Sequence, residues 1–243
     1  RGTGSRSRKS SAQKPPDLRP SAYGYDDKAD RPEGGPAVWT RAKSRFIAPN
    51  DIQAEGTWIA VNERGVAACL LNRYDPAPPG RRTRGDIAVE AMSGVSVADA
   101  VQCVAALPLN EYAPFTCLLV DAGGVTKLDW TGASWTRSDI TIDVIMVTSS
   151  SWRLDEVKAQ RERYFQQIWA AHKSDRDRLA AFHCRTDFES THWTPMMLRP
   201  QSQTKSITQI ELGPTGVEMR YWRRESAIAR GLSAPDTNIR LAN

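Results

Sequence analysis

The sequence of 243 residues contains no long hydrophobic run. No window approaches the ~18 uncharged apolar residues of a membrane-spanning helix, so no such helix is expected. No internal repeat with a period of about 20 to 50 residues is present, which excludes solenoids and propellers. The Gly-rich phosphate-binding motifs and the Gly-x-Ser-x-Gly motif are also missing. Nucleotide binding therefore has no support, and an α/β-hydrolase is disfavoured.

Cysteine and histidine are sparse, with four and three residues respectively. The cysteines form no Cys-x-x-Cys pair and no dense disulfide framework, and the chain starts without a secretory segment. We therefore expect a reduced, cytoplasmic protein. His183, Cys184, Asp187 and His192 lie close in the sequence, but their spacing matches no tetrahedral zinc pattern. Neither a metal nor another cofactor is expected.

Basic charge is concentrated at the start of the chain. Residues 1–20 carry six basic residues and one aspartate, a net charge of +5, which equals the formal net charge of the whole chain. Because this segment has hardly any apolar anchor, we expect residues 1–22 to form a disordered basic tail and residues 23–243 to form a single domain. Contact with nucleic acid or a membrane is expected only through this tail.

Hydrophobic periodicity and turn residues predict strands and helices in alternating blocks. Strand hairpins followed by helices and then by further hairpins favour an α+β fold over a doubly wound parallel sheet. Residues 21–44, which are rich in proline and glycine, are predicted to be irregular. Strands are predicted over 45–48, 57–63, 65–72, 115–120, 125–130, 140–147, 206–212 and 217–222, and helices over 84–92, 97–107, 155–172 and 175–183.

Residues 56–74 form the most informative stretch. Two apolar runs flank a turn in which Gly65 supplies the positive φ that such turns need, and the second run ends near Asn72 and Tyr74. A hairpin that ends in this way can present a side-chain amide to a pocket. A core hairpin with a solvated end is the alternative interpretation.

Short motifs occur in a recognisable order over about 200 residues of the chain. Together they resemble the NRDE family, a relative of the N-terminal-nucleophile hydrolases. The resemblance implies a four-layer αββα sandwich. The motifs are Gly56-Thr57-Trp58-Ile59-Ala60-Val61-Asn62, Leu71-Asn72-Arg73, Thr83-Arg84-Gly85-Asp86, Val147-Thr148-Ser149-Ser150-Ser151, Lys205-Ser206-Ile207-Thr208 and Met219-Arg220-Tyr221.

The chain departs from the family pattern in two places. Where the family has Asn-Arg-Asp-Glu, this chain retains only Asp26, with Asp27 in place of the glutamate. The family also begins with Met-Cys and an apolar strand, and the Cys is its expected nucleophile. Here nothing upstream of Gly24 reads as a strand and no cysteine precedes Cys69. The first strand and its cysteine therefore either precede Arg1 or are lacking, and both alternatives stay open.

The resemblance implies hydrolysis of a linear, non-peptide C–N amide. A terminal cysteine would attack the carbonyl, with its own α-amine as the base. Asp26 is the candidate that orients the amine and thiol, and Asn72 and Ser149 are the candidate donors to the oxyanion. Arg84 is a candidate ligand for a substrate carboxylate. The other residues assigned to substrate binding are Trp58, Tyr74 and Ser206.

Two other classes of protein compete with a hydrolase. The resemblance also implies a non-catalytic protein that binds or carries an apolar ligand, such as a lipid or haem, in a pocket floored by Trp58. The eroded motif and the missing terminal cysteine favour this alternative. The third class is an adaptor that binds nucleic acid or anionic lipid through the basic tail, and its binding would depend on salt concentration.

Overall fold

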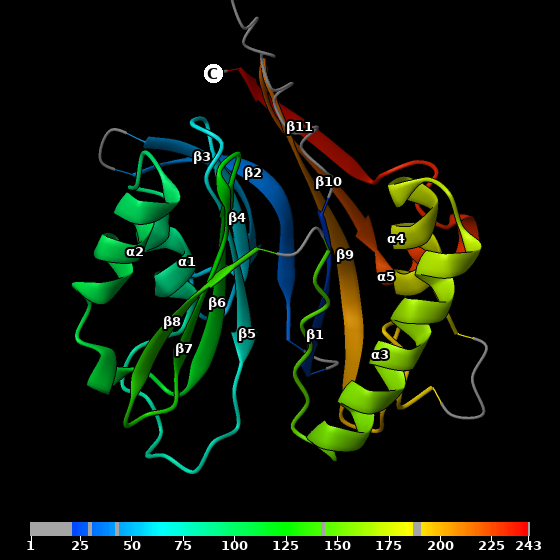
Figure 1. Ribbon diagram of the computed structural model, residues 1–243, viewed down its shortest axis with the longest axis horizontal. Helices are drawn as coiled ribbons and strands as arrows, with labels where there is room; N and C mark the ends of the chain where they lie inside the picture. Colours follow the sequence, from blue (N-terminus) through cyan, green and yellow to red (C-terminus); the bar gives the residue numbers. More distant parts are fainter. Residues whose placement is uncertain (1–20, 29–30, 42–43, 142–143, 187–190, 243) are drawn as a thin grey trace, which may run out of the picture.

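The computed structural model describes residues 21–28, 31–41, 44–141, 144–186 and 191–242. Two antiparallel sheets pack face to face, and helices cover the outer face of each (Figure 1). The order of layers is helix, sheet, sheet, helix. The four-layer αββα sandwich predicted from the sequence is therefore confirmed. No helix in the described part of the chain is long and apolar enough to cross a membrane.

The larger sheet has seven strands in the order β2-β3-β4-β5-β6-β7-β8, and every neighbouring pair is antiparallel. Helices α1 (Gly85–Ala91) and α2 (Val97–Ala105) cover its outer face, and the 3₁₀ turn η1 (Leu109–Glu111) follows them. The strands are β2 (Glu33–Arg41), β3 (Ser44–Asp51), β4 (Ile59–Asn62), β5 (Ala67–Asn72), β6 (Phe115–Asp121), β7 (Gly124–Trp130) and β8 (Trp135–Ile140).

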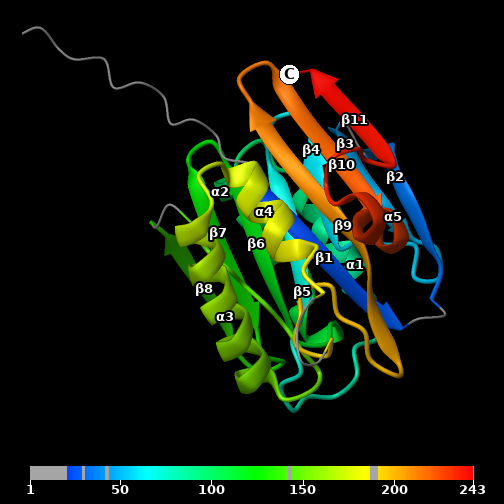
Figure 2. The ribbon, with the colours of Figure 1, turned by 90° about the vertical axis from the view of Figure 1, so that its right-hand side faces the viewer.

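The smaller sheet has four strands in the order β1-β9-β10-β11. Its outer face carries three helices, which Figure 2 shows in front of the strands. The strands are β1 (Ser21–Lys28), β9 (Ser202–Gly213), β10 (Gly216–Arg223) and β11 (Thr237–Ala242), and the helices are α3 (Leu154–Ala171), α4 (Asp175–His183) and α5 (Arg224–Arg230).

Three apolar clusters hold the layers together. Strands β4 and β5 lie at the centre of the larger sheet, with their residues packed against α1 and α2 on one face and against the smaller sheet on the other. Burial on both faces explains why the sequence there reads as two continuous apolar runs. Side chains of β9 point to opposite faces of the smaller sheet. Ile210 and Leu212 pack between the two sheets, whereas Ile207 packs outward toward α5.

Several sequence-based boundaries were wrong. Residues 21–44 contain β1 and β2 rather than irregular chain, because β9 and β3 supply hydrogen-bonding partners that the local sequence does not reveal. The register of β2 shifts between Gly34 and Ala37, and this bulge accommodates Pro36. The strand predicted over 140–147 is instead β8 at 135–140, and residues 144–150 have no regular secondary structure.

The end of the chain and the predicted tail also differ from expectation. Helix α5 and strand β11 were missed, although β11 completes the smaller sheet. Ser21 and Ala22, predicted as part of the basic tail, belong to β1. The rest of the predicted tail, residues 1–20, lies outside the described residues.

Candidate functional site

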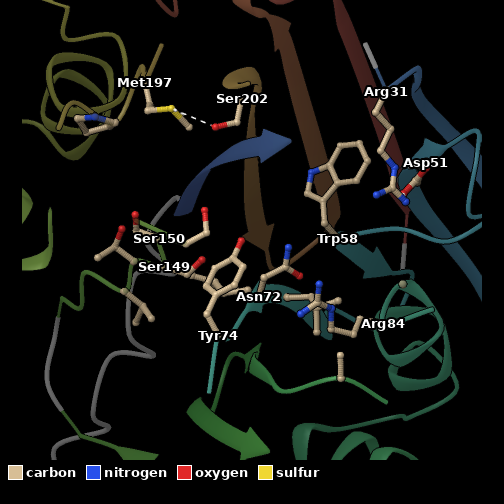
Figure 3. A pocket seen from close by; sticks show the side chains of 18 of the residues that line it. Arg31, Asp51, Trp58, Asn72, Tyr74, Arg84, Ser149, Ser150, Met197 and Ser202 are labelled. Carbon is tan, nitrogen blue, oxygen red and sulfur yellow. Dashed lines mark hydrogen bonds and ion pairs between the residues drawn. The ribbon is translucent and has the colours of Figure 1, made fainter. Parts of the chain in front are cut away.

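A cleft of about 1020 Å³ opens between the two halves of the sandwich (Figure 3). Its first side, here called the sheet wall, consists of residues 57–58, 70–72, 74, 80 and 82–85, which belong to the larger sheet and the loop that leads to α1. Its second side, the helix wall, consists of residues 146–151, 161, 182–183, 195, 197 and 199–202. Segments far apart in the sequence therefore meet at one site.

The hairpin of β4 and β5 positions the central residues of the sheet wall. Trp58 is only 4% exposed, and its carbonyl accepts a hydrogen bond from the Leu70 N–H at 2.8 Å. Asn72 ends β5 opposite Phe115 of β6. Tyr74 follows in the loop and is 52% exposed. Figure 3 shows the Trp58 indole, the Asn72 amide and the Tyr74 ring directed into the same space.

A close backbone crossing places Arg84 beside this hairpin. A Cβ added to Gly56 would lie 2.7 Å from the Gly85 Cα, so only glycine permits the two chain segments to approach this closely. The Thr57 N–H points to the Gly85 carbonyl at 3.5 Å. Arg84 donates from Nη1 to the Pro114 carbonyl at 3.0 Å, which directs its guanidinium along the cleft edge.

Arg31 and Asp51 form an ion pair at the edge of the cleft (Figure 3). Nη2 of Arg31 lies 2.5 Å from Oδ2 of Asp51, and Nε donates to Oδ1 at 3.1 Å. The same Oδ1 accepts from the backbone N–H groups of Gln53 and Ala54. This carboxylate therefore fixes both the turn after β3 and the arginine that faces the cleft.

The helix wall depends on a buried arginine of α3. Arg161 is 6% exposed and donates to the carbonyls of Trp193 and Thr194 at 3.1 and 2.8 Å. Its Nη1 donates to Oγ1 of Thr148 at 2.6 Å. One guanidinium thus joins the two irregular segments that form this wall, and it holds the segment that carries Ser149 in place.

The lining of the cleft is strongly basic. Among the described residues, five arginines and one aspartate contribute to it, without lysine or glutamate. Arg82 is positioned by Asp86 at 3.4 Å and by the ring of Tyr112, and Arg199 by the carbonyl of His192. The excess of positive charge makes the cleft suited to an anionic or carboxylate-bearing ligand.

The structure brings together five of the seven residues that the sequence pointed to. They are Trp58, Asn72, Tyr74, Arg84 and Ser149. Ser206 does not line the cleft: it is fully buried between the sheets, and its Oγ donates to Oε2 of Glu33 at 3.4 Å. The backbone of Asp26 pairs with Thr204 across β1 and β9, but its side chain lies outside the described residues. Its catalytic role stays a prediction.

Sequence reasoning missed several polar residues of the cleft, above all Arg31, Asp51, Arg161 and His183. Arg31 and Pro32 match the Arg-Pro pair that follows the family motif, which is a signal for Arg31. Nothing in the sequence separates Arg161 from the other polar residues of α3. It is identified only by its burial against two distant segments.

None of the four cysteines of the sequence lines the cleft. Burial raises the pKa of the Cys69 thiol to about 12 and raises that of Cys117 further. Burial also raises the pKa of Cys184 to about 11 and that of Cys103 above its usual range. These thiols stay protonated at neutral pH and are poor nucleophiles. The described residues contain no group of three acidic, histidine or cysteine side chains that could hold a metal ion.

Several solved structures are similar to this chain. A penicillin V acylase from Agrobacterium tumefaciens superposes with a TM-score of 0.54 at 17% identity, over 93% of this chain and 83% of that chain. An N-acylethanolamine-hydrolyzing acid amidase ortholog from Caenorhabditis elegans gives a TM-score of 0.49 at 9% identity, over 79% and 90% of the two chains. A mutant conjugated bile acid hydrolase from Clostridium perfringens gives 0.48 at 11%, over 93% and 88%.

The chain therefore has the N-terminal-nucleophile hydrolase fold. No curated protein matches its sequence. The sequence matches one family over residues 25–220, which is most of the chain and includes both walls of the cleft. The chain belongs to the Transport and Golgi organisation 2 (TANGO2) family.

Proposed function

We propose that the cleft binds a small-molecule amide with an anionic group, and that it is the substrate site of an N-terminal-nucleophile-type hydrolase of C–N amide bonds. The observation that carries the proposal is the meeting of Asn72, Arg84 and Ser149 with the aromatic side chains of Trp58 and Tyr74 in one basic cleft. The fold supports hydrolysis as the reaction class, since a similarly folded protein is a penicillin V acylase.

Each side chain has a defined role in this proposal. Asn72 donates from its amide nitrogen, and Ser149 from its hydroxyl, to the oxygen that becomes negative when the carbonyl is attacked. Arg84 pairs with the carboxylate of the substrate. Trp58 and Tyr74 contact its apolar part. The basic lining favours binding of an anion over binding of a neutral lipid.

The nucleophile in this proposal is a terminal cysteine that precedes Arg1. Its thiol proton passes to the free α-amine, and the thiolate attacks the amide carbonyl. The C–N bond then breaks, the leaving amine takes the proton from the α-ammonium group, and an acyl thioester remains. Water hydrolyses the thioester, which releases the acid and restores the thiol.

Non-catalytic binding of an anionic, amphipathic ligand is the second candidate. One observation favours it: none of the chain's four cysteines lines the cleft, and burial raises the pKa of all four thiols. In this case the same arginines and aromatic side chains would hold the ligand without cleaving it.

Penicillin V, which is an aromatic amide with a carboxylate, is a suitable probe for both candidates. The protein expressed from its full reading frame is incubated with penicillin V, and release of phenoxyacetic acid is measured by mass spectrometry. If the protein is a hydrolase, we expect turnover of penicillin V by the wild type. Turnover should fall by about 10²- to 10³-fold in Asn72→Ala, because a donor to the oxyanion is lost. Asn110→Ala, an exposed asparagine of η1, is the matched control and keeps full activity.

Product release and binding together distinguish the hydrolase from the carrier. Binding of penicillin V by calorimetry without release of product supports the carrier alternative, as does a reading frame that lacks a terminal cysteine. Absence of both binding and turnover contradicts the proposed ligand class. Equal turnover in the wild type and in Asn72→Ala contradicts the assignment of the oxyanion site.

A further inference from the structure

Residues 144–150 have no regular secondary structure, although they carry Ser149, the candidate oxyanion donor of the helix wall. A donor to an oxyanion acts because it is fixed before the reaction begins. A side chain on irregular backbone must be held by neighbouring hydrogen bonds, since no helix or strand ladder holds it. The two residues beside Ser149, which are Thr148 and Ser150, make such bonds.

Ser150 fixes the C-terminal side of Ser149. Its hydroxyl donates to the carbonyl of Trp152 at 2.5 Å and accepts the N–H of the same residue at 3.1 Å. Ser150 is only 7% exposed. Because its hydroxyl closes this turn just before α3, Ser149 rather than Ser150 is the candidate donor to a ligand.

Arg161 of α3 fixes the N-terminal side of Ser149. Its Nη1 donates to Oγ1 of Thr148 at 2.6 Å. Its Nε and Nη2 donate to the carbonyls of Trp193 and Thr194 at 3.1 and 2.8 Å. The guanidinium is planar and rigid, so it cannot turn away from Thr148 without also losing its bonds to the two carbonyls. Thr148 is therefore held in place one residue before Ser149.

The segment that anchors Arg161 is attached to β9. Thr204 of β9 is fully buried and donates from Oγ1 to the carbonyl of Pro195 at 2.6 Å. The same oxygen accepts the N–H of Met197 at 2.9 Å, and the N–H of Thr204 donates to the carbonyl of Met197 at 2.9 Å. These bonds fix the residues that directly follow the two carbonyls. Hydrogen bonds thus connect the smaller sheet, through Arg161, to the residue that precedes Ser149.

We propose that Arg161 is a positioning residue, which acts through Thr148 to hold the hydroxyl of Ser149 where the oxyanion forms. Arg161 itself makes no contact with the reacting atoms. The inference rests on the proposed function, because it assumes that Ser149 donates to an oxyanion in the cleft. An arginine that only stabilises the fold would change stability alone, and one that binds the ligand would change affinity.

Turnover of penicillin V by the full-length protein tests the inference, with kcat and KM measured separately. Arg161→Lys keeps the positive charge but loses the planar fork that reaches three acceptors. We expect kcat to fall about 10- to 100-fold, because a displacement of about 1 Å in a catalytic group has an effect of this size. KM should stay within about 2-fold, since the bond from Ser149 strengthens in the transition state. Arg163→Lys, at an exposed position of the same helix, is the matched control and should keep the wild-type kcat.

Substitutions of Thr148 test the hydrogen bond without changing the arginine. Thr148→Val has nearly the same shape but no acceptor for Arg161, so kcat should fall as in Arg161→Lys. Thr148→Ser keeps the hydroxyl and should retain most of the wild-type kcat. Thermal unfolding shows whether each variant is folded at the temperature of the assay. If Arg161→Lys is unfolded, Thr148→Val carries the test, because it removes a single hydroxyl group.

A double-mutant cycle assigns the effect to Ser149. If Arg161 acts through Ser149, Arg161→Lys should lower kcat by less than about 2-fold once Ser149→Ala is present. An equal loss with and without Ser149→Ala would mean that Arg161 affects turnover by another route, and the inference would be wrong.

The inference and the proposed function fail in different ways. If the wild type releases phenoxyacetic acid but Arg161→Lys and Thr148→Val keep its kcat, the inference is wrong and the proposed function stands. A raised KM with an unchanged kcat in Arg161→Lys shows that Arg161 binds the ligand directly, which also overturns the inference. If the wild type releases no phenoxyacetic acid, the proposed hydrolysis is wrong and the inference falls with it.

Discussion

The hydroxyl group of Tyr221 donates to Oε1 of Glu33 at 2.7 Å, and this bond joins β10 of the smaller sheet to β2 of the larger one. Ser206 donates to the other carboxylate oxygen of Glu33, and Lys205 donates to the carbonyl of Arg31. A polar cluster therefore links the two sheets next to the cleft. Burial raises the pKa of both Glu33 and Tyr221.

Removal of the hydroxyl group should weaken the link between the sheets. Tyr221→Phe leaves the desolvated carboxylate of Glu33 without its shortest hydrogen bond, so we expect a loss of about 1–3 kcal/mol in the free energy of unfolding. Urea unfolding followed by tryptophan fluorescence measures this loss. Tyr74→Phe, in an exposed loop, is the matched control, with an expected change within about 0.5 kcal/mol. Equal effects of the two substitutions would disprove the role of the cluster.

Glu33 should make stability depend on pH. Its folded-state pKa is raised above the ordinary value of 4.5, chiefly by desolvation. Its contribution to stability is therefore fully present below the unfolded pKa and is lost as the pH rises through the folded pKa. Glu33→Gln does not titrate, so its stability relative to the wild type should increase between pH 4 and pH 7. Urea unfolding of both proteins across this range measures the difference.

The control for that experiment is Glu162→Gln, a substitution at an exposed residue of α3. Its stability relative to the wild type should not change with pH in this way. A difference between wild type and Glu33→Gln that stays constant with pH, or that changes in the opposite direction, contradicts the raised pKa.

The crossing of Gly56 and Gly85 should tolerate no side chain. A Cβ at Gly56 would lie 2.7 Å from backbone, so we expect Gly56→Ala to lose about 1–3 kcal/mol or more and to displace Arg84 from the cleft. Gly35→Ala is the control, because its nearest new contact is Oγ1 of Thr237 at 3.7 Å. Thermal unfolding of both variants measures the effect. Wild-type stability of Gly56→Ala would show that this backbone contact is not required.

The buried thiols should resist alkylation. Burial raises the pKa of Cys69 to about 12 and also that of Cys117, so neither forms a thiolate at pH 8 in the folded protein. We expect iodoacetamide to leave both unmodified in the folded state and to label all four cysteines in guanidinium chloride. Peptide mass spectrometry reports each site. Rapid labelling of Cys69 in the folded protein would contradict its burial.

Local sequence was sufficient for the central part of the fold. The apolar runs of β4 and β5, the turn at Gly65 and the helical stripe of α2 depend on residues close in sequence, and all three elements were predicted. The resemblance to the family also pointed to residues of the cleft. Trp58, Asn72, Tyr74, Arg84 and Ser149 line it.

Contacts between residues distant in the sequence decided the rest of the fold and of the candidate site. Strand β1 exists because β9 pairs with it, although the two are separated by more than 170 residues, and no local pattern encodes that partner. Ser206 is fully buried, and its hydroxyl donates to Glu33 of the other sheet instead of lining the cleft. Arg161 and His183 reach the cleft only because α3 and α4 pack beside segments distant in the sequence. The sequence by itself determined which residue types and motifs are present; the tertiary structure decided which of them meet, since hydrogen bonds and burial depend on partners that the chain brings together only when it folds.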